Sequence, residues 1–389
     1  MTQPTPATPA DHQPIDIDLD ADKQQVDKLK GHRLRKFFKT AIDHKASDLI
    51  VKTDAKVRVR LKGDLRELDA EPMTGEELEQ AIEAMLSPVQ VQHFKTHGSV
   101  DMAYAYDEDN RFRVNIFRAR GRTALAARRV SSEILTLRQL HLPEGMEKIG
   151  EAREGLVLLC GVTGSGKSTT IAAMIQQINE ARPCHIVTIE DPIEYIFKDA
   201  KAVVNQREIG VDVPDFPEAL RALVRENPDV VLIGEMRDRE TFEAAIQAAE
   251  TGHLVFGTVH ASSAAQAFGR VYNLFPPEER DLIREMFAAN LKAIIYQKLL
   301  PALPEDMARV PATEILLNGP VVHKYITDER ETELVDVIRG ARGEGMMDMT
   351  SSLVELVEKE YIHPRVALAN AHNADELKMR LKGIKTGTG

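Results

Sequence analysis

Apolar and polar residues alternate with a period of two near the beginning of the chain. Between Lys56 and Gly63, the apolar residues Val57, Val59 and Leu61 are separated by basic residues. A strand points successive side chains to opposite faces, so this pattern predicts a half-buried strand with one basic face in water.

A helix and a hairpin are predicted to follow this strand. Thr74 and Glu77 have the spacing of a capping box, which predicts a helix that continues to Met85. The segments Met102–Tyr106 and Arg111–Phe117 flank the turn sequence DEDN and predict a β-hairpin. Together these elements predict a small α+β domain over residues 28–136.

The pattern changes after residue 154. Four short apolar runs are separated by helical stretches, at Gly155–Cys160, His185–Glu190, Asp229–Gly234 and Leu254–Thr258. Continuous apolar runs of this length are typical of parallel strands that are covered on both faces. One intervening helix, Glu240–Thr251, is followed by Gly252, which can adopt the left-handed conformation that ends helices. We therefore expect an α/β core over residues 155–300.

The remaining segments are assigned by composition and spacing. Residues 137–154 contain Pro143 and Gly145 and little alternation, which favours a linker. From Pro277 onward the spacing predicts mostly helix, and residues 301–382 are expected to form a helical C-terminal region. The predicted buried stripe consists of Leu282, Ile283, Met286, Phe287, Leu291, Ile294 and Ile295. Residues 1–27 are rich in proline and aspartate and are expected to be a disordered tail, with a short flexible tail at 383–389.

Composition narrows the class of protein. The 389 residues are 43% hydrophobic and 29% charged, which is typical of globular domains. The net charge of −11 argues against a protein whose overall field attracts nucleic acid. Two cysteines are too few for a disulfide framework or a four-cysteine zinc site, and they suit a reducing compartment. Without a long apolar run or a signal peptide, the chain is expected to be soluble and cytoplasmic.

The clearest chemical motif follows the first apolar run of the α/β core. The sequence GVTGSGKS satisfies G-x-x-x-x-G-K-[ST] between a predicted strand and a predicted helix, which predicts a P-loop for ATP. Lys167 is expected to reach the β- and γ-phosphates, and the Ser168 hydroxyl to ligate Mg²⁺. The predicted nucleotide-binding residues are Gly161, Val162, Thr163, Gly164, Ser165, Gly166, Lys167, Ser168 and Thr169.

Acidic residues end two of the other predicted strands. Glu235 follows the apolar run of a Walker B motif and is expected to hold Mg²⁺ directly or through water; the alternative is a surface acid. Glu190, Asp191 and Glu194 lie within five residues of each other, and Pro192 favours a loop there. Such carboxylates can supply metal ligands, here Glu190 and Asp191, and a general base, although a solvated acidic loop would have the same sequence.

His253 and His260 flank the fourth apolar run. Seven residues apart, they lie on opposite faces of a regular strand, which argues against a shared metal site. At the strand end, His260 is suited to sense the γ-phosphate. For His253, capping or packing is as good an interpretation as catalysis.

Five ordered segments carry a resemblance to a known family: GVTGSGKSTT, TIEDPIEY, PDVVLIGEMRD, AAETGHLVFGTVH and ATEILLN. Over roughly residues 30–380 the chain resembles the secretion ATPase superfamily, specifically the type IV pilus retraction ATPases of the PilT/PilU type. The resemblance implies a homo-hexamer of subunits with a PAS-like N-terminal domain and a RecA-like ATPase domain. It also implies that Glu194 is the base that activates water.

The resemblance further implies that arginines of the N-terminal domain reach the nucleotide. Arg113 and Arg128 match that region, while a basic strand face in water is the alternative. The implied partners are an inner-membrane pilus platform protein and a paralogous retraction ATPase, with no nucleic acid. The protein would then lie at the cytoplasmic face of the inner membrane, held there through its partner.

The chain departs from the family pattern at three places. Val162 stands where proline is usual, and Phe197 where histidine is frequent. Where retraction motors carry AIRNLIRE, this chain has VVHKYITDERETEL, and its C-terminal residues resemble the PilU branch. Two alternatives remain: a pilus-assembly or type II secretion ATPase, whose usual tetracysteine insert is missing here, and an ATP-binding regulatory subunit with little turnover. A nucleic-acid motor is a weaker one.

Overall fold

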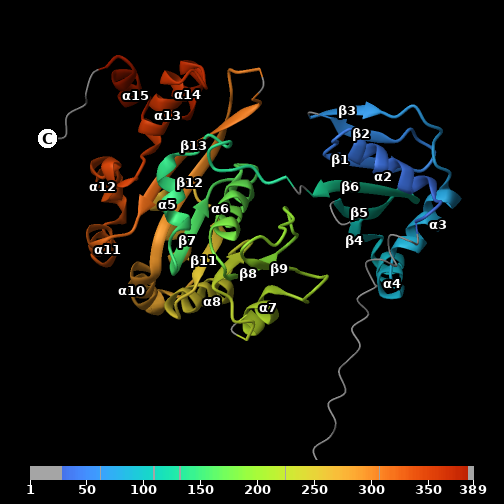
Figure 1. Ribbon diagram of the computed structural model, residues 1–389, viewed down its shortest axis with the longest axis horizontal. Coiled ribbons are helices and arrows are strands. Elements are labelled where there is room, and N and C mark those ends of the chain that lie inside the picture. The colour runs from blue at the N-terminus through green and yellow to red at the C-terminus, as the bar shows by residue number, and fades with distance from the viewer. Residues whose placement is uncertain are drawn as a thin grey trace, which may run out of the picture. The chain divides into compact units, whose positions relative to one another are not determined.

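The computed structural model describes residues 29–61, 63–107, 110–130, 133–223, 225–305 and 307–383. The chain divides into two compact units, Met1–Val130 and Ser131–Gly389 (Figure 1). The predicted tail at 1–27 and all but the first residue of the tail at 383–389 lie outside the described residues.

In its described residues, the first unit consists of a six-stranded antiparallel sheet with three helices. Its strand order is β3-β2-β1-β6-β5-β4, with β1 (Asp48–Lys52), β2 (Arg58–Leu61), β3 (Asp64–Glu67), β4 (Ser99–Ala105), β5 (Arg111–Ala119) and β6 (Arg122–Val130). The helices are α2 (Arg33–Asp43), α3 (Gly75–Met85) and α4 (Pro88–His97). The predicted hairpin is confirmed as β4 and β5, and the predicted strand as β2.

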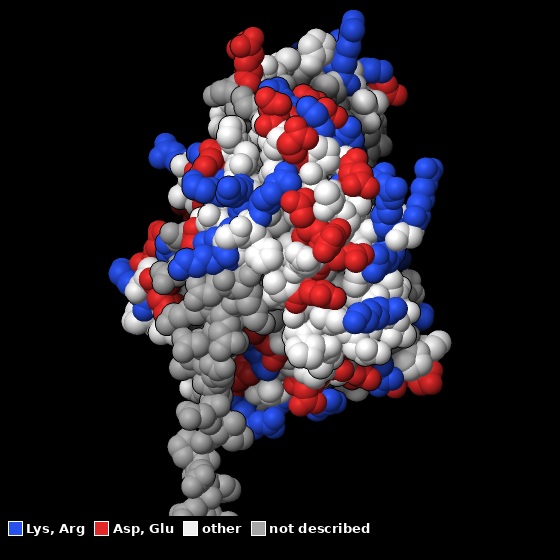
Figure 2. Space-filling model, turned by 90° about the vertical axis from the view of Figure 1, so that its right-hand side faces the viewer, with Lys and Arg blue, Asp and Glu red and all other residues white. Residues whose placement is uncertain are grey.

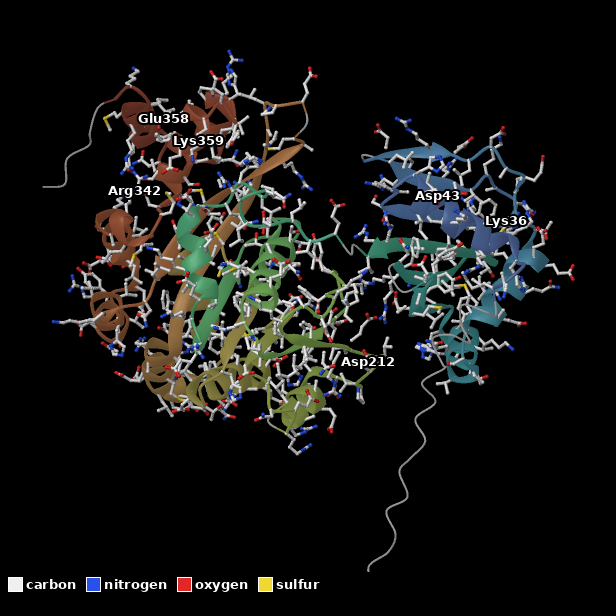
Figure 3. All side chains as sticks on the ribbon, viewed as in Figure 1. Lys36, Asp43, Asp212, Arg342, Glu358 and Lys359 are labelled. Carbon is white, nitrogen blue, oxygen red and sulfur yellow. The ribbon has the colours of Figure 1, made fainter. Side chains whose placement is uncertain are left out.

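Helix α2 joins this sheet through an aromatic cluster. The ring of Phe38 lies 4.6 Å from that of Tyr104 and 4.8 Å from that of Phe112. Lys36 and Asp43, on the same helix, are exposed to solvent (Figure 3). The predicted capping box is also confirmed, because Glu77 N donates to Thr74 Oγ1 and Thr74 N donates to a Glu77 carboxylate oxygen. Burial on one side of the sheet leaves its other side available for polar residues.

The second unit is built on a seven-stranded sheet in the order β13-β12-β7-β11-β10-β8-β9. Its strands are β7 (Gly155–Cys160), β8 (His185–Glu190), β9 (Val203–Glu208), β10 (Val230–Ile233), β11 (Leu254–Val259), β12 (Leu291–Pro301) and β13 (Arg309–Leu317). Neighbouring strands are parallel except for β13, which is antiparallel to β12. The four predicted strands are therefore confirmed as β7, β8, β10 and β11.

Helices cover both faces of this sheet. Alternate residues of β7 enter different cores: Val157 and Leu159 pack with α6, whereas Leu156 and Leu158 pack with α8 and α9. The helices before residue 291 are α5 (Glu147–Gly150), α6 (Lys167–Ala181), α7 (Phe216–Leu223), α8 (Arg239–Glu250), α9 (Ala264–Tyr272) and α10 (Arg280–Asn290), with 3-10 turns η1 (Glu144–Met146) and η2 (Pro277–Glu279). Burial on both faces explains the continuous apolar runs of these strands.

The C-terminal part adds short helices to the antiparallel edge of the sheet. They are α11 (Pro320–Thr327), α12 (Leu334–Gly340), α13 (Met349–Glu358), α14 (Pro364–Asn370) and α15 (Ala374–Leu381), with 3-10 turns η3 (Glu331–Glu333) and η4 (Arg342–Glu344). Among the helices of the described residues, none combines the length and the apolar composition needed to cross a bilayer.

One expectation is wrong. The stripe predicted from Leu282 to Ile295 is not one helix, because α10 ends at Asn290 and the chain continues as β12; Leu282 is 64% exposed. Strand β13 lies within residues 301–382, whose other described elements are helices and 3-10 turns apart from the end of β12. A strand covered on both faces has no period of two, so its apolar residues matched a helical spacing by chance.

The segment 137–154 is not a free linker. Leu137, Leu142, Met146 and Ile149 are buried in the core that α6 and β7 share. The division of the chain at Val130 also precedes the expected boundary at residue 136. The segment therefore belongs structurally to the second unit.

Candidate active site

The loops that follow four parallel strands lie at one edge of the second unit's sheet. Cys160 of β7 pairs in register with Val259 of β11, and Ile233 of β10 pairs with Gly257 of β11 and Ile189 of β8. Because parallel strands end at the same edge, the motifs that follow them are brought together there. Open α/β sheets bind their ligands at this edge.

The P-loop connects β7 to α6 at this edge. Gly161 and Gly166 have φ angles of +148° and +88°, which favour glycine. Lys167 opens α6, and its Nζ donates to the carbonyl oxygens of Gly161, at 2.9 Å, and Val162, at 3.2 Å. A loop of this shape before a helix N-terminus presents backbone N–H groups and a positive dipole to an anion.

Two acidic residues affect the charge of the Lys167 ammonium. Burial lowers the pKa of Lys167, while Glu235, Cys160 and Glu194 act in the opposite direction. The carboxylates of Glu235 and Glu194 therefore lie close enough to the ammonium to stabilise its charge. The structure brings the predicted Walker A, Walker B and acidic-loop residues to one place.

Glu235 contacts the side chains of Arg237 and His260. Arg237 Nη2 lies 2.5 Å from Glu235 Oε2, and His260 Nε2 lies 3.2 Å from Glu235 Oε1. Burial alone would raise the pKa of Glu235, but the hydrogen bond and charge of Arg237, with a contribution from His260, bring that pKa below its usual value. Glu235 is therefore ionised, as a metal ligand must be. Arg237 was not among the predicted site residues, although an arginine two residues after the Walker B acid was a usable signal.

The three acids after β8 have different environments. Glu190 is 7% exposed; its Oε1 accepts hydrogen bonds from Thr188 Oγ1 at 2.7 Å and Gln206 Nε2 at 3.2 Å. Burial raises the pKa of Glu190 to about 7. In contrast, Asp191 and Glu194 are exposed. Only the exposed pair can meet water or a metal without breaking an existing hydrogen bond.

The two histidines lie at opposite ends of β11. His260 follows the strand and contacts Glu235, whereas His253 precedes it. His253 Nδ1 lies 2.8 Å from the carbonyl oxygen of Ala248 and 3.0 Å from Thr251 Oγ1. These contacts cap the C-terminal end of α8, so the structure places His253 away from the P-loop edge.

The two predicted arginines of the first unit are direct neighbours. Arg113 of β5 pairs in register with Arg128 of β6, which pairs with Asp48 of β1, which pairs with Arg60 of β2. Residues opposite each other in a sheet project from the same face. Asp48 binds Arg128 at 2.9 Å and Arg60 at 3.1 Å. Three arginines and one aspartate give this row a net charge of +2.

The donors at the P-loop edge suit magnesium. In the described residues there is no group of three or more histidine, cysteine or acidic side chains assembled for a metal. Mg²⁺ takes oxygen ligands and is usually held by one or two protein groups together with phosphates and water. The Ser168 hydroxyl and the ionised Glu235 carboxylate fit that requirement.

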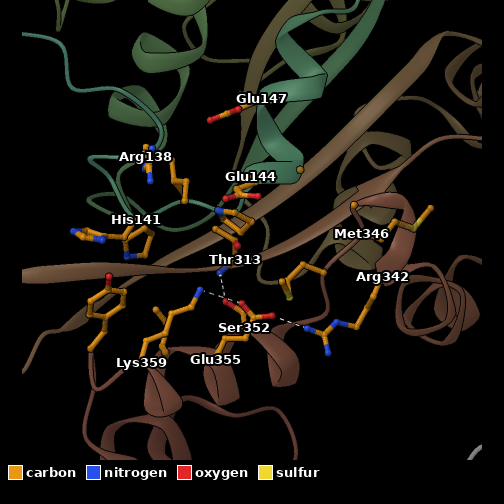
Figure 4. Close-up of a pocket in the computed structure, with 18 residues that line it drawn as sticks. Arg138, His141, Glu144, Glu147, Thr313, Arg342, Met346, Ser352, Glu355 and Lys359 are labelled. Carbon is orange, nitrogen blue, oxygen red and sulfur yellow. Dashed lines mark hydrogen bonds and ion pairs between the residues drawn. The ribbon is translucent and has the colours of Figure 1, made fainter.

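A separate cavity lies in the second unit, between the segment that begins this unit and its C-terminal elements. It has a volume of about 860 Å³ and is lined by the segment from Arg138 to Glu147, by Pro311 and Thr313, and by residues of the C-terminal helices (Figure 4). An ion pair between Arg342 and Glu355 crosses its wall. None of the predicted site residues lines it.

Charge on the surface is mixed in sign. On the face shown in Figure 2, lysines and arginines are interspersed with aspartates and glutamates. A face of this kind carries no large field of one sign.

Comparison with known proteins gives consistent matches over most of the chain. The family described as type II/IV secretion system protein matches residues 22–361. A twitching motility protein of Neisseria gonorrhoeae is 39% identical over 82% of this chain and 85% of its own length. The type IV pilus ATPase PilU of Pseudomonas aeruginosa is 34% identical over 89% of this chain and 91% of its own length.

A solved structure is also similar. The crystal structure of the pilus retraction motor PilT with bound ADP has a TM-score of 0.82 and 37% sequence identity, and the match covers 89% of this chain and 98% of that one. This similarity confirms the predicted RecA-like secretion ATPase fold.

Proposed function

Since the chain belongs to the type II/IV secretion system protein family, we propose that it is an ATPase that retracts type IV pili. The observation that carries the proposal is the register of β7, β8, β10 and β11, which brings the P-loop, Glu194, Glu235 and His260 to one edge of the sheet, where His260 Nε2 lies 3.2 Å from Glu235 Oε1. Phosphoryl transfer needs this combination of positioned cations and carboxylates at a phosphate-binding loop.

In this proposal the P-loop holds the phosphates of ATP. Backbone N–H groups from Gly164 to Ser168 and the N-terminus of α6 receive the α- and β-phosphates. When ATP binds, the Lys167 ammonium gives up its hydrogen bonds to the carbonyl oxygens of Gly161 and Val162 and binds the β- and γ-phosphates instead. The negative charge of the phosphates then neutralises the ammonium. Burial of the Lys167 side chain lowers its pKa, so a bound anion nearby stabilises the protonated form of the ammonium.

Two acids divide the remaining tasks. Ser168 and Glu235 would hold Mg²⁺, which supplies charge neutralisation at the β- and γ-phosphates when bound. Glu194 is exposed and close to Lys167, so it is the base that accepts a proton from the attacking water. Asp191, which is exposed, would be available to a water bound to the metal. We exclude Glu190 from the metal shell because its oxygens already accept hydrogen bonds from Thr188, Gln206 and the backbone.

The first unit supplies two candidate arginines in this proposal. Arg113 and Arg128 lie opposite each other on one face of their sheet, and a nucleotide phosphate is an anion that both guanidinium groups can bind. In a homo-hexamer, sequential hydrolysis would then drive a platform protein of the inner membrane, at its cytoplasmic face, with a paralogous ATPase as a further partner.

ATP turnover by the purified protein tests the enzymatic part. Lys167→Ala and Glu194→Gln should each lower kcat at least 100-fold, since positioned charge supplies most of the catalysis. Glu147→Gln, which lines the separate cavity, is the matched control and should leave kcat unchanged. ATP binding without turnover in the unaltered protein would instead favour a regulatory subunit.

Deletion of the gene tests the direction of work. Cells without a retraction motor should become hyperpiliated and lose twitching, and the Lys167→Ala variant should fail to restore it. Loss of pili would contradict retraction and favour an assembly motor.

A further inference from the structure

Gln297 lies directly behind the P-loop. It belongs to β12, the strand next to β7, and the preceding residue Tyr296 pairs in register with Cys160, the last residue of β7. Gln297 is therefore level with Gly161, the first residue of the loop, and is only 2% exposed. A buried amide costs free energy unless its hydrogen bonds are made.

Both ends of the Gln297 side chain bind the nucleotide loop region. Its Nε2 donates to the carbonyl oxygen of Ser165 at 2.8 Å, and its Oε1 accepts from Thr170 Oγ1 at 2.8 Å. Ser165 lies in the loop and Thr170 in the first turns of α6. One amide therefore connects the loop to the helix that follows it.

The loop packs on Gln297 without spare space. A Cβ atom on Gly161 would lie 2.5 Å from the Gln297 carbonyl oxygen, and a Cβ atom on Gly166 would lie 2.7 Å from Gln297 Nε2. These distances are far below van der Waals contact. The two glycines thus allow the backbone to approach Gln297 as closely as it does.

We propose that Gln297 is a positioning residue that holds the P-loop in its phosphate-binding shape. The carbonyl of Ser165 and the N–H of Gly166 belong to one planar peptide and point in opposite directions. By binding that carbonyl, Gln297 aims the Gly166 N–H away from β12. The inference rests on the proposed function, because it assigns this N–H to the phosphates of the bound nucleotide.

An amide satisfies both contacts without needing a bound proton. The Ser165 carbonyl requires a donor and the Thr170 hydroxyl requires an acceptor, and glutamine supplies one of each. A glutamate would oppose the Ser165 carbonyl with an acceptor unless it were protonated. A methionine of similar length would supply neither group.

Direct measurement of ADP binding to the full chain tests the proposal. Gln297→Met should raise the Kd for ADP about tenfold, equivalent to about 1.4 kcal/mol, since the loop must then be ordered by the nucleotide. At saturating ATP, kcat should stay within about threefold of that of the unaltered protein. Thr313→Val is the matched control: Thr313 is buried opposite Gln297 in β13, and its hydroxyl has no partner among the described residues.

A pH titration separates this role from simple packing. For Gln297→Glu, the defect in ADP affinity should shrink severalfold between pH 8 and pH 6, because a protonated carboxyl can again donate to Ser165. A defect that does not change with pH would mean that only packing was lost and would overturn the proposal.

Variants at Thr170 test the other contact, should the Gln297 variants fold poorly. Thr170→Val should raise the Kd for ADP severalfold, whereas Thr170→Ser, which keeps the hydroxyl, should not. Unchanged ADP affinity in both Gln297→Met and Thr170→Val would overturn the positioning role while leaving the ATPase proposal intact. Failure of the unaltered protein to bind ADP would instead overturn the proposed function.

Discussion

Two carboxylates of the acidic loop, Glu190 and Glu194, differ in burial and therefore in the chemistry that they can perform. Glu190 is enclosed by Thr188 and Gln206, and its pKa of about 7 favours a proton in the folded protein. Glu194, four residues later, is exposed near Lys167. A buried acid would have to break its hydrogen bonds before it could accept a proton from water. Glu190 therefore suits a structural role in the loop, and Glu194 suits the proposed role of general base.

Glu190 should make stability depend on pH. Its pKa rises from 4.5 in the unfolded chain to about 7 in the folded one, so its favourable contribution is complete below pH 4.5 and is lost as the pH rises through 7. Between pH 5 and pH 8, the free energy of unfolding should fall by about 2 kcal/mol less in Glu190→Gln than in the unaltered protein. Urea unfolding at the two pH values measures this difference. An equal fall in both proteins would contradict the raised pKa of Glu190.

In the proposed mechanism, Asp48 competes with the nucleotide phosphate for Arg128. It binds Arg128 and Arg60 with a carboxylate whose side chain is 15% exposed. Asp48→Asn should lower the KM for ATP by up to about fivefold, because a partly exposed ion pair contributes up to about 1 kcal/mol. Steady-state kinetics measures the change. Asp54→Asn, which breaks the comparable pair with Arg122, is the control and should not alter KM; a rise in KM for Asp48→Asn would refute the competition.

At the scale of elements, the P-loop depends on a strand that lies far from it in the sequence. Strand β12 is separated from the loop by more than a hundred residues, yet it pairs with β7. The spacing of its apolar residues also fits a helix. It forms a strand because it pairs with β13 and β7 on its two edges and is buried on both faces. The sheet edge that binds nucleotide is thus completed by an element that local pattern misassigns.

Two glycines of the loop should respond differently to substitution. Gly161→Ala places a Cβ atom against the backbone of β12, whereas a Cβ atom on Gly164 has nothing within 4 Å. Both have positive φ, so each substitution carries a backbone cost of about 1 kcal/mol. Gly161→Ala should lower kcat/KM for ATP more than 100-fold and Gly164→Ala less than tenfold. Equal losses in the ATPase assay would mean that backbone strain, not contact with β12, decides.

At the scale of the molecule, each unit has a core of its own. Buried residues between Leu29 and Ala127 form one core, while the segment 137–154 is buried in the second unit through Leu142, Met146 and Ile149. The boundary of the ATPase unit therefore lies near residue 131, earlier than composition indicates.

Truncation should reveal this boundary. A fragment of residues 133–389 should fold and bind ADP, and the proposed mechanism expects its kcat to fall at least tenfold because Arg113 and Arg128 are missing. A fragment of residues 155–389 should aggregate, since it loses the apolar side chains that cover α6 and β7. Circular dichroism and thermal unfolding compare the two fragments. Equal thermal stability of the two fragments would contradict a unit boundary near residue 131.

The chain's own sequence determined the P-loop, the Walker B acid, the acidic loop and four parallel strands, because each depends on neighbouring residues and short apolar runs. It could not determine that Glu190 is buried while Glu194 is exposed, that Arg237 and His260 bind Glu235, or that Gln297 supports the P-loop. Those facts arise where strands distant in the sequence pair in register. Burial and hydrogen-bond partners are properties of the assembled sheet, so only the tertiary structure could decide them.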